Sequence, residues 1–143
     1  MAAENIPNIM RDFVKSMEKG DVDKALSFLT DDVDWVTPTG TIKGKDQIRR
    51  YFSSEAMKGL TVTESGNGII AQGNRALFEH DLEATYRGRK AKWLAICAYE
   101  FNGDKIQHMR TVFDRLSLAQ QMSSGLPKML VNQIVKQSEK MVR

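Results

Sequence analysis

The sequence predicts an α+β domain in which helices pack over one face of a curved, mainly antiparallel sheet. Apolar residues recur at helical spacing up to about residue 52, alternate with polar residues from about residue 60 to residue 114, and return to helical spacing near the C-terminus. Short segments containing glycine separate the alternating runs, and such segments join antiparallel neighbours. Helices followed by a meander of strands are typical of the α+β class.

Two helices are expected at the start of the chain. Residues 6–17 carry an apolar stripe at helical spacing, with Pro7 near its start and Gly20 just after its end, where each residue suits the backbone. Asp21 can cap a second, short helix whose apolar stripe ends before Thr30. We therefore expect a helical hairpin to open the domain.

A short strand over residues 33–37, ended by a turn at residues 38–40, precedes a third helix that begins after Gly44. The hydrophobic period then changes from 3.6 to 2, which is the period of strands. Long strands are expected over residues 60–66, 68–72, 75–86, 91–102 and 105–114.

A further helix is expected in the tail. Around and after Pro127 a stripe at helical spacing is formed by Leu126, Met129, Leu130, Ile134, Gln137 and Met141, all of them apolar except Gln137. We expect residues 1–122 to form the conical body of one domain and residues 123–143 to be a C-terminal helical extension. The extension could close a cavity as a lid, pack on a partner subunit or bind another protein.

Composition excludes several classes of protein. At 143 residues the chain fits one domain, and no apolar run approaches the ~20 residues that span a bilayer, so no membrane partner is expected. The N-terminus lacks a basic segment followed by an apolar stretch, which favours a cytoplasmic location. The single cysteine, Cys97, cannot form an internal disulfide or a multi-thiolate metal site.

The net charge of +3 is concentrated in the tail. Residues 115–143 hold five Lys or Arg residues and one acidic residue, which leaves the remainder close to neutral. Widely spaced cations without interleaved aromatic residues are typical of a solvated helix face. No nucleic-acid partner is therefore expected.

The strand expected over residues 105–114 places ionisable side chains together with aliphatic ones. Ile106, His108, Arg110, Val112 and Asp114 fall on one parity, and alternate side chains of a strand point to the same face. Burying a charge among apolar neighbours is costly unless the charge is paired. This face therefore forms either a structural ion pair or part of a cavity with polar groups, and we assign it to a cavity.

The two preceding strands supply further cavity candidates. His80 is the polar exception on the face that also carries Phe78. In the next strand Trp93, Cys97 and Tyr99 share one parity, while the other parity is also apolar, so both faces of this strand are expected to be covered. We assign the face of His80 to the cavity because an ionisable group needs water, a ligand or a partner.

Four residues are candidates for acid–base chemistry. A carboxylate in an apolar pocket becomes a better proton acceptor, so Asp114 is the first candidate for a general base, against an ion pair or a cap at the end of its strand. His80 and His108 could exchange protons with a substrate or be hydrogen-bonded core residues, and Arg110 could stabilise an oxyanion. Metal binding is not expected, since no closely spaced ligand motif is present.

An aromatic set could wall a cavity for a flat or polycyclic molecule, although core packing explains the same residues. The set is Trp35, Tyr51, Phe52, Phe78, Trp93 and Tyr99.

Three segments resemble the nuclear transport factor 2-like superfamily and, within it, the SnoaL-like group related to polyketide cyclases and ketosteroid isomerases. They are residues 28–35, residues 44–52, and residues 103–106 running into Arg110 and residues 112–114. The resemblance implies a cone whose mouth lies between the helices and the concave sheet, contacts from Trp35, Tyr51 and Phe52 to its pocket, and a homodimer through the outer face of the sheet. Such folds host isomerases, dehydratases, cyclases, epoxide hydrolases and binding proteins.

The leading hypothesis is a SnoaL-like protein that binds a small apolar metabolite in a conical pocket, with cofactor-free isomerisation, cyclisation or dehydration as its possible chemistry. Asp114 would be the base, His80 or His108 its proton partner and Arg110 the oxyanion stabiliser. The tyrosine and protonated aspartic acid of ketosteroid isomerases, and the full Asp-Arg-Asp set of limonene epoxide hydrolases, have no clear counterpart in the sequence. The alternative is a non-catalytic binding or assembly module that uses the C-terminal helix.

Overall fold

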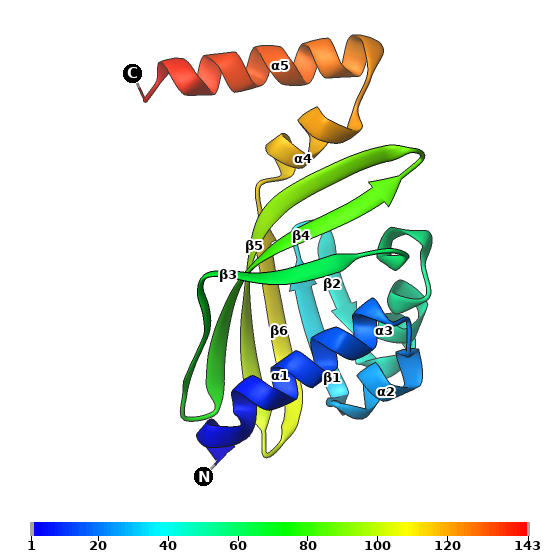
Figure 1. Cartoon of the computed structure of the whole chain (residues 1–143), viewed down its shortest axis with the longest axis vertical. Helices are drawn as coiled ribbons and strands as arrows, with labels where there is room; N and C mark the ends of the chain where they lie inside the picture. Colours follow the sequence, from blue (N-terminus) through cyan, green and yellow to red (C-terminus); the bar gives the residue numbers. More distant parts are fainter. Residues whose placement is uncertain (1, 143) are drawn as a thin grey trace.

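Helices cover the concave face of a six-stranded sheet (Figure 1). The computed structural model describes residues 2–142, with side chains from residue 5. The sheet order is β2-β1-β6-β5-β4-β3, and every pair is antiparallel except β1 with β6. The strands are β1 (Leu29–Thr37), β2 (Gly40–Lys43), β3 (Thr61–Gln72), β4 (Arg75–Tyr86), β5 (Arg89–Asn102) and β6 (Lys105–Phe113). This confirms the predicted mainly antiparallel sheet.

Three helices and a short 3₁₀ helix lie between the N-terminus and the meander, and two helices follow it. They are α1 (Ala2–Glu18), α2 (Val22–Ser27), α3 (Gly44–Phe52), the 3₁₀ helix η1 (Glu55–Met57), α4 (Arg115–Met122) and α5 (Gly125–Lys140). Asp21 caps α2 as expected, because its carboxylate accepts a hydrogen bond of 3.1 Å from the backbone N–H of Lys24. The predicted helical hairpin is therefore present.

The core forms where the apolar stripe of α1 meets the sheet and α3. Ile6, Met10 and Phe13 of α1 are almost fully buried, together with Ile48 of α3 and Ile106 of β6. Removing such side chains from water is the main stabilising contribution to the fold. The core therefore lies between α1, α3 and the concave face of the sheet.

Strand β3 is continuous where the sequence predicts two strands. The segment Gly66-Asn67-Gly68 forms a bulge opposite Glu79 of β4, because the register passes from Glu64 opposite His80 to Ile69 opposite Phe78. The Glu79 carboxylate accepts hydrogen bonds from the backbone N–H and the side-chain amide of Asn67, at 3.0 and 3.1 Å. The glycines thus supply a bulge, which bends the sheet, and not a turn.

A second bulge, in β6, changes which residues face the core. Phe101 of β5 is paired with Ile106, whereas the adjacent Glu100 is paired with His108, so Gln107 is an extra residue in β6. One extra residue reverses the facing of every side chain beyond it. The buried residues of β6 are consequently Ile106, Met109 and Thr111, which corrects the predicted single parity of residues 106–114.

The strand β2, which the sequence analysis did not predict, forms a hairpin with β1 at the sheet edge. At the other end of the chain, α4 lies against β5, whereas α5 packs chiefly on α4 and extends away from the sheet (Figure 1). No helix within residues 2–142 has the length and apolar character needed to cross a membrane.

Candidate functional site

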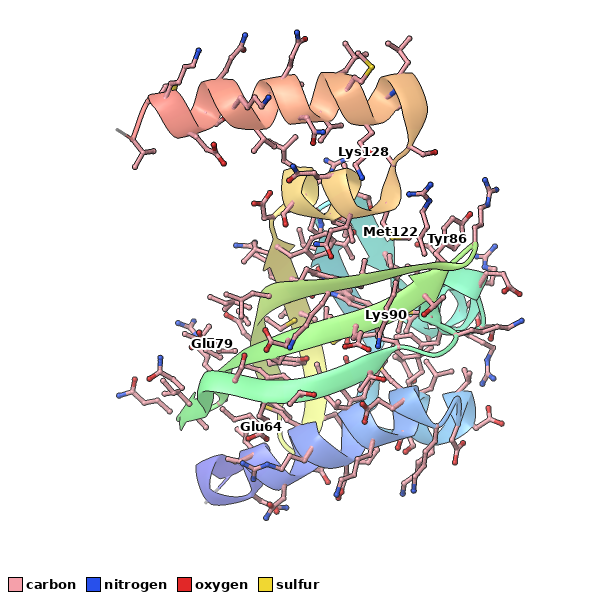
Figure 2. All side chains as sticks on the ribbon, turned by 45° about the horizontal axis from the view of Figure 1, so that its top comes forward. Glu64, Glu79, Tyr86, Lys90, Met122 and Lys128 are labelled. Carbon is pink, nitrogen blue, oxygen red and sulfur yellow. The ribbon has the colours of Figure 1, made fainter. Side chains whose placement is uncertain are left out.

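A cavity of about 560 Å³ lies between the concave sheet face and the surrounding helices. Strands β4, β5 and β6 form its floor, α1 and η1 one side, and Leu118 and Met122 of α4 part of its cover. Tyr86 and Met122 lie near each other where α4 passes the β4–β5 hairpin (Figure 2). The aromatic residues in the lining are Phe13, Trp35, Tyr51, Phe78, Tyr86, Trp93, Tyr99 and Phe113.

The lining is mainly apolar and nearly free of charge. Glu55 is the one Asp, Glu, Lys or Arg that the described residues contribute, and its carboxylate lies 2.5 Å from the Lys58 ammonium group. An unpaired ion inside such a cavity would lose its hydration without compensation. The cavity therefore favours uncharged molecules.

His80 projects from β4 into the cavity, on the face that we assigned to the cavity because it carries an ionisable group. Only 4% of the residue is exposed, and its ring stacks on Phe78 with centroids 4.2 Å apart. Burial lowers the pKa of His80, so the imidazole is neutral at neutral pH. Its Nδ1 lies 3.1 Å from the carbonyl oxygen of Phe78, and because that oxygen can only accept, Nδ1 carries the proton and Nε2 keeps its lone pair.

A chain of polar groups continues from His80 across the cavity floor. The Trp35 indole N–H donates to Thr111 Oγ1 at 2.8 Å, and Thr111 Oγ1 lies 3.1 Å from Cys97 Sγ. Cys97 Sγ is in turn 4.0 Å from His80 Nε2. All three contacts are satisfied if the hydrogen bonds run in one direction. The Trp35 indole donates to Thr111, the Thr111 hydroxyl donates to Cys97, and the Cys97 thiol points its hydrogen toward His80.

Burial keeps the neighbouring acids protonated. It raises the pKa of the Cys97 thiol to about 11 and holds the pKa of Tyr99 well above its ordinary value. Burial also raises the pKa of Tyr51, at the side of the cavity. The site thus presents neutral hydrogen-bonding groups in an apolar wall, and the thiol is a poor nucleophile.

The other three predicted acid–base residues lie outside the cavity. His108 is on the outer face, where Nδ1 lies 2.7 Å from Asp34 Oδ1, and this hydrogen bond raises the pKa of His108. Arg110 is exposed on the same outer face. Asp114 caps α4, because its Oδ1 accepts hydrogen bonds from the backbone N–H groups of Leu116 and Ser117 at 2.9 and 3.0 Å. The expectation that these three side chains line the cavity is therefore wrong, and the cause is the bulge at Gln107.

Most of the predicted aromatic set lines the cavity. Trp35, Tyr51, Phe78, Trp93 and Tyr99 do so. Phe52 is instead a core residue behind the lining, with ring centroids 6.1 Å from Phe13 and 6.0 Å from Trp35.

Sequence reasoning missed Thr111, Met109 and the cover formed by α4. The first two lie on the parity that the bulge turns inward, and no residue near Gln107 signals a bulge. The cover has a signal that could have been used, since Asp114 followed by Leu116, Leu118 and Met122 resembles a capped helix. Within the described part of the chain, no three His, Cys, Asp or Glu side chains converge as metal ligands would.

Comparison with known proteins agrees with this geometry. Solved structures with a similar fold include a nuclear transport factor 2-like protein from Burkholderia xenovorans LB400, with 21% sequence identity, coverage of 85% of this chain and 98% of that chain, and a TM-score of 0.72. TerC, co-crystallised with polyporic acid, has 21% identity, coverage of 82% and 97%, and a TM-score of 0.73. A protein with a ketosteroid isomerase-like fold from Catenulispora acidiphila DSM 44928, in complex with trimethylamine, has 15% identity, coverage of 80% and 92%, and a TM-score of 0.72.

These structural similarities show the fold, and the match to a family profile shows the family. The profile of the SnoaL-like domain matches residues 10–109, which span α1 to the middle of β6 and most of the cavity floor. The chain therefore belongs to the SnoaL-like domain family, and it shares the fold of nuclear transport factor 2-like proteins.

Proposed function

We propose that this protein binds a small, uncharged and predominantly apolar molecule in its conical cavity. The observation that carries the proposal is the cavity of about 560 Å³ with aromatic walls and a floor of neutral polar groups. Small-molecule sites have volumes of roughly 300–1,000 Å³ and combine apolar walls with a few placed polar groups. A flat molecule of two or three fused rings fits both the volume and the aromatic walls.

Any acid–base chemistry in this cavity centres on His80. Its unprotonated Nε2 can take up a proton, whereas Asp114, Arg110 and His108 are too far outside to take part. Replacing His80 with Gln keeps hydrogen-bonding groups but removes the base. Once a substrate is known, His80→Gln is expected to lose turnover while still binding it, and unchanged turnover would show that His80 is not the catalytic base.

The binding proposal can be tested by filling the cavity. Ala84 of β4 lines the cavity, whereas Ala98 of β5 lies on the parity that faces away from it. Isothermal titration calorimetry with fluorene, a neutral tricyclic hydrocarbon, should give one site per chain in the wild type. Ala84→Trp should weaken this binding by roughly tenfold or more, and Ala98→Trp, the matched control, by less than twofold.

A charged analogue provides the second arm of this test. Fluorene-9-carboxylate has the same ring system, and its carboxylate would have to be desolvated without a cation in the cavity. It should bind at least roughly a hundredfold more weakly than fluorene. Absence of fluorene binding, or equal binding to the two alanine variants, would overturn the proposal.

A second candidate function is assembly through α5, favoured by the apolar stripe that this helix leaves exposed. Leu126, Leu130 and Ile134 are between 51% and 66% exposed, although an isolated helix of this length is marginally stable in water. The outer face of the sheet also exposes apolar residues, namely Ile70, Leu77, Leu94, Ile96 and Val112. A homodimer would cover such surfaces.

Deleting residues 124–143 separates the two roles of this helix. If α5 serves assembly, light scattering coupled to gel filtration should show a smaller species, while fluorene binding stays intact. If α5 serves as a lid, the mass per particle stays the same and fluorene binds more weakly. A triple Ser variant at Leu126, Leu130 and Ile134 should reproduce the result without shortening the chain, with Gln133→Ser as its control.

A further inference from the structure

Helix α4 takes the place of a missing strand at the edge of the cavity. Strand β6 ends at Phe113, opposite Ala95, whereas β5 begins at Arg89, so residues 89–94 of β5 have no β6 residue beside them. Helix α4 lies against β5 and contributes Leu118 and Met122 to the cavity (Figure 1). An unpaired strand edge leaves backbone N–H and C=O groups that need partners. This edge of β5 is therefore closed by a helix.

One side chain of α4 bonds directly to this edge. The Gln121 amide accepts a hydrogen bond from the Lys92 backbone N–H and donates one to the Lys92 carbonyl oxygen, at 2.9 Å each. The two bonds repeat the pattern by which an antiparallel neighbour would pair with Lys92. Close by, the Arg89 guanidinium donates to the carbonyl oxygen of Ser123, at the end of α4, at 3.2 Å. Gln121 and Arg89 thus fasten the end of α4 to β5.

Apart from these bonds, α4 is weakly anchored. None of its residues is fully buried, whereas α1, on another side of the cavity, is held by buried Ile6 and Phe13. The start of α4 is fixed by the Asp114 cap and by Arg115, whose guanidinium donates to the Pro38 carbonyl oxygen at 3.1 Å. Segments with few buried apolar contacts and with solvent-exposed hydrogen bonds are those that open locally. Rotation of α4 about its start would therefore leave the core intact.

Two unpaired polar atoms lie at the same contact. Trp93 Nε1 and Ser123 Oγ are shut off from solvent, and neither has a hydrogen-bond partner among the described residues. Trp93 follows Lys92 in β5, and Ser123 follows the last residue of α4, so both lie where the helix meets the strand. An unpaired buried polar group lowers the stability of the arrangement that buries it. The closed contact therefore carries a cost that the Gln121 and Arg89 bonds offset.

We propose that α4 is a cover that opens from β5 to admit and release the bound molecule, and that Gln121 is its latch. The helix rotates about Asp114 as a hinge, and α5, which packs chiefly on α4, moves with it. Opening breaks the Gln121 bonds to Lys92 and uncovers the cavity along the free edge of β5, beside Leu118 and Met122. This inference rests on the proposed binding function and adds the route by which the molecule enters.

Binding kinetics test the latch, with stopped-flow fluorescence giving the association and dissociation rate constants of fluorene. Gln121→Ala removes both bonds to Lys92. Gln120→Ala is the matched control, because Gln120 donates to Asn132 of α5 at 2.9 Å and not to β5. We expect Gln121→Ala to raise both rate constants about fivefold and to change Kd less than about twofold, because the latch stabilises the closed form equally with and without ligand. Gln120→Ala should keep both rate constants within about twofold of wild type.

A second measurement needs no ligand. Exchange of the Lys92 backbone N–H with deuterium requires that its bond to Gln121 breaks, so NMR of the ¹⁵N-labelled protein reports how often α4 opens. Arg89→Met removes the other fastening and leaves this bond in place. It should accelerate Lys92 exchange about fivefold, whereas Gln120→Ala should change it less than about twofold. The amide of Phe13 in the core should exchange at the wild-type rate in both variants, which separates opening of the cover from unfolding.

Three results would overturn the inference. If fluorene binds and Gln121→Ala leaves both rate constants unchanged, the molecule enters elsewhere and the proposed binding function stands. If Arg89→Met leaves Lys92 exchange unchanged, α4 does not open as a unit held by these bonds. If wild-type protein does not bind fluorene, the proposed function fails and the entry route fails with it, which absent binding distinguishes from unchanged rates.

Discussion

The two histidines show how position alone sets the chemistry of a side chain. His80 is buried beside Phe78 in the cavity, where loss of hydration lowers its pKa. His108 is exposed on the outer face, where the hydrogen bond to Asp34 raises its pKa. The sequence alone does not distinguish the two, because an imidazole within a strand has no local signal of its surroundings.

Titration of the two histidines by NMR provides a direct check. The Cε1–H resonance of His80 should titrate below the ordinary value of about 6.5 and that of His108 above it. Asp34→Asn should lower the pKa of His108 toward the ordinary value and leave His80 unchanged. A His80 pKa above 6.5 would contradict its placement in an apolar cavity.

The same shifts act on stability in opposite directions. The pKa of His108 is higher in the folded protein than in the unfolded chain. Its stabilising contribution to the free energy of unfolding is therefore fully present at pH values below the pKa of the unfolded chain, and it is lost as the pH rises through the pKa of the folded protein. The pKa of His80 is lower in the folded protein than in the unfolded chain, so the unfolded chain binds a proton more readily. The free energy of unfolding therefore decreases as the pH falls below the pKa that His80 has in the unfolded chain. Urea unfolding of His80→Phe should show less acid sensitivity between about pH 6.5 and 5 than the wild type.

Cys97 is expected to be inert in the folded protein. Its pKa of about 11 leaves roughly a hundredfold less thiolate at pH 8 than an ordinary thiol has, and burial restricts access as well. Reaction with a chromogenic disulfide reagent should therefore be at least roughly a hundredfold slower in native than in unfolded protein. A native rate within tenfold of the unfolded rate would show that the cavity floor is open to reagents.

At the scale of elements, the two bulges separate what the sequence predicts from what it does not. Alternation of apolar and polar residues predicted the antiparallel meander of β4, β5 and β6, and the structure agrees. It did not predict β2 or the continuity of β3. The face of β6 does not follow from this alternation either, because one extra residue at Gln107 exchanges the inner and outer faces. A bulge depends on how two strands pair. The pattern of apolar and polar residues along one strand therefore does not reveal where an extra residue is inserted.

The bulge in β3 depends on Gly66. This residue has φ = +55°, and a Cβ atom there would lie 2.2 Å from the carboxylate of Glu79. Gly66→Ala is expected to lower the free energy of unfolding by about 2 kcal/mol, from both backbone strain and the lost Glu79–Asn67 hydrogen bonds.

Gly73→Ala is the matched control, because Gly73 has φ = +59° but open space around its Cβ position. It should cost about 1 kcal/mol, the backbone contribution alone. Equal losses of stability in the two variants, measured by urea unfolding, would contradict the contact with Glu79.

Helix α4 depends on Asp114 as a cap, and this role can be separated from that of a base. Asp114→Ala should lower the free energy of unfolding by about 1 kcal/mol, whereas Asp114→Asn should retain most of the cap. Fluorene binding should be unchanged by Asp114→Asn, because the side chain lies outside the cavity. A large loss of fluorene binding in Asp114→Asn would contradict the placement of Asp114 outside the cavity.

At the scale of the whole molecule, the sequence predicted the layers of the fold but not the boundary of its cavity. Resemblance in three segments pointed to the SnoaL-like group, which the match over residues 10–109 confirms. The cavity boundary needs contributions from α1, η1, four strands of the meander and α4, so it depends on tertiary packing that no single segment encodes. The apolar stripe of α5 was predicted, and its exposure in the single chain makes assembly the remaining question at this scale.

Native mass spectrometry of freshly purified, never unfolded protein tests the central claim most directly. If the cavity is a binding site for neutral apolar molecules, the spectrum should show one retained or added molecule per 16.2 kDa chain, either from the cell or after addition of fluorene. Ala84→Trp should show little or none, while Ala98→Trp should resemble the wild type. A wild-type spectrum that contains only the bare chain mass, with and without fluorene, would contradict the account.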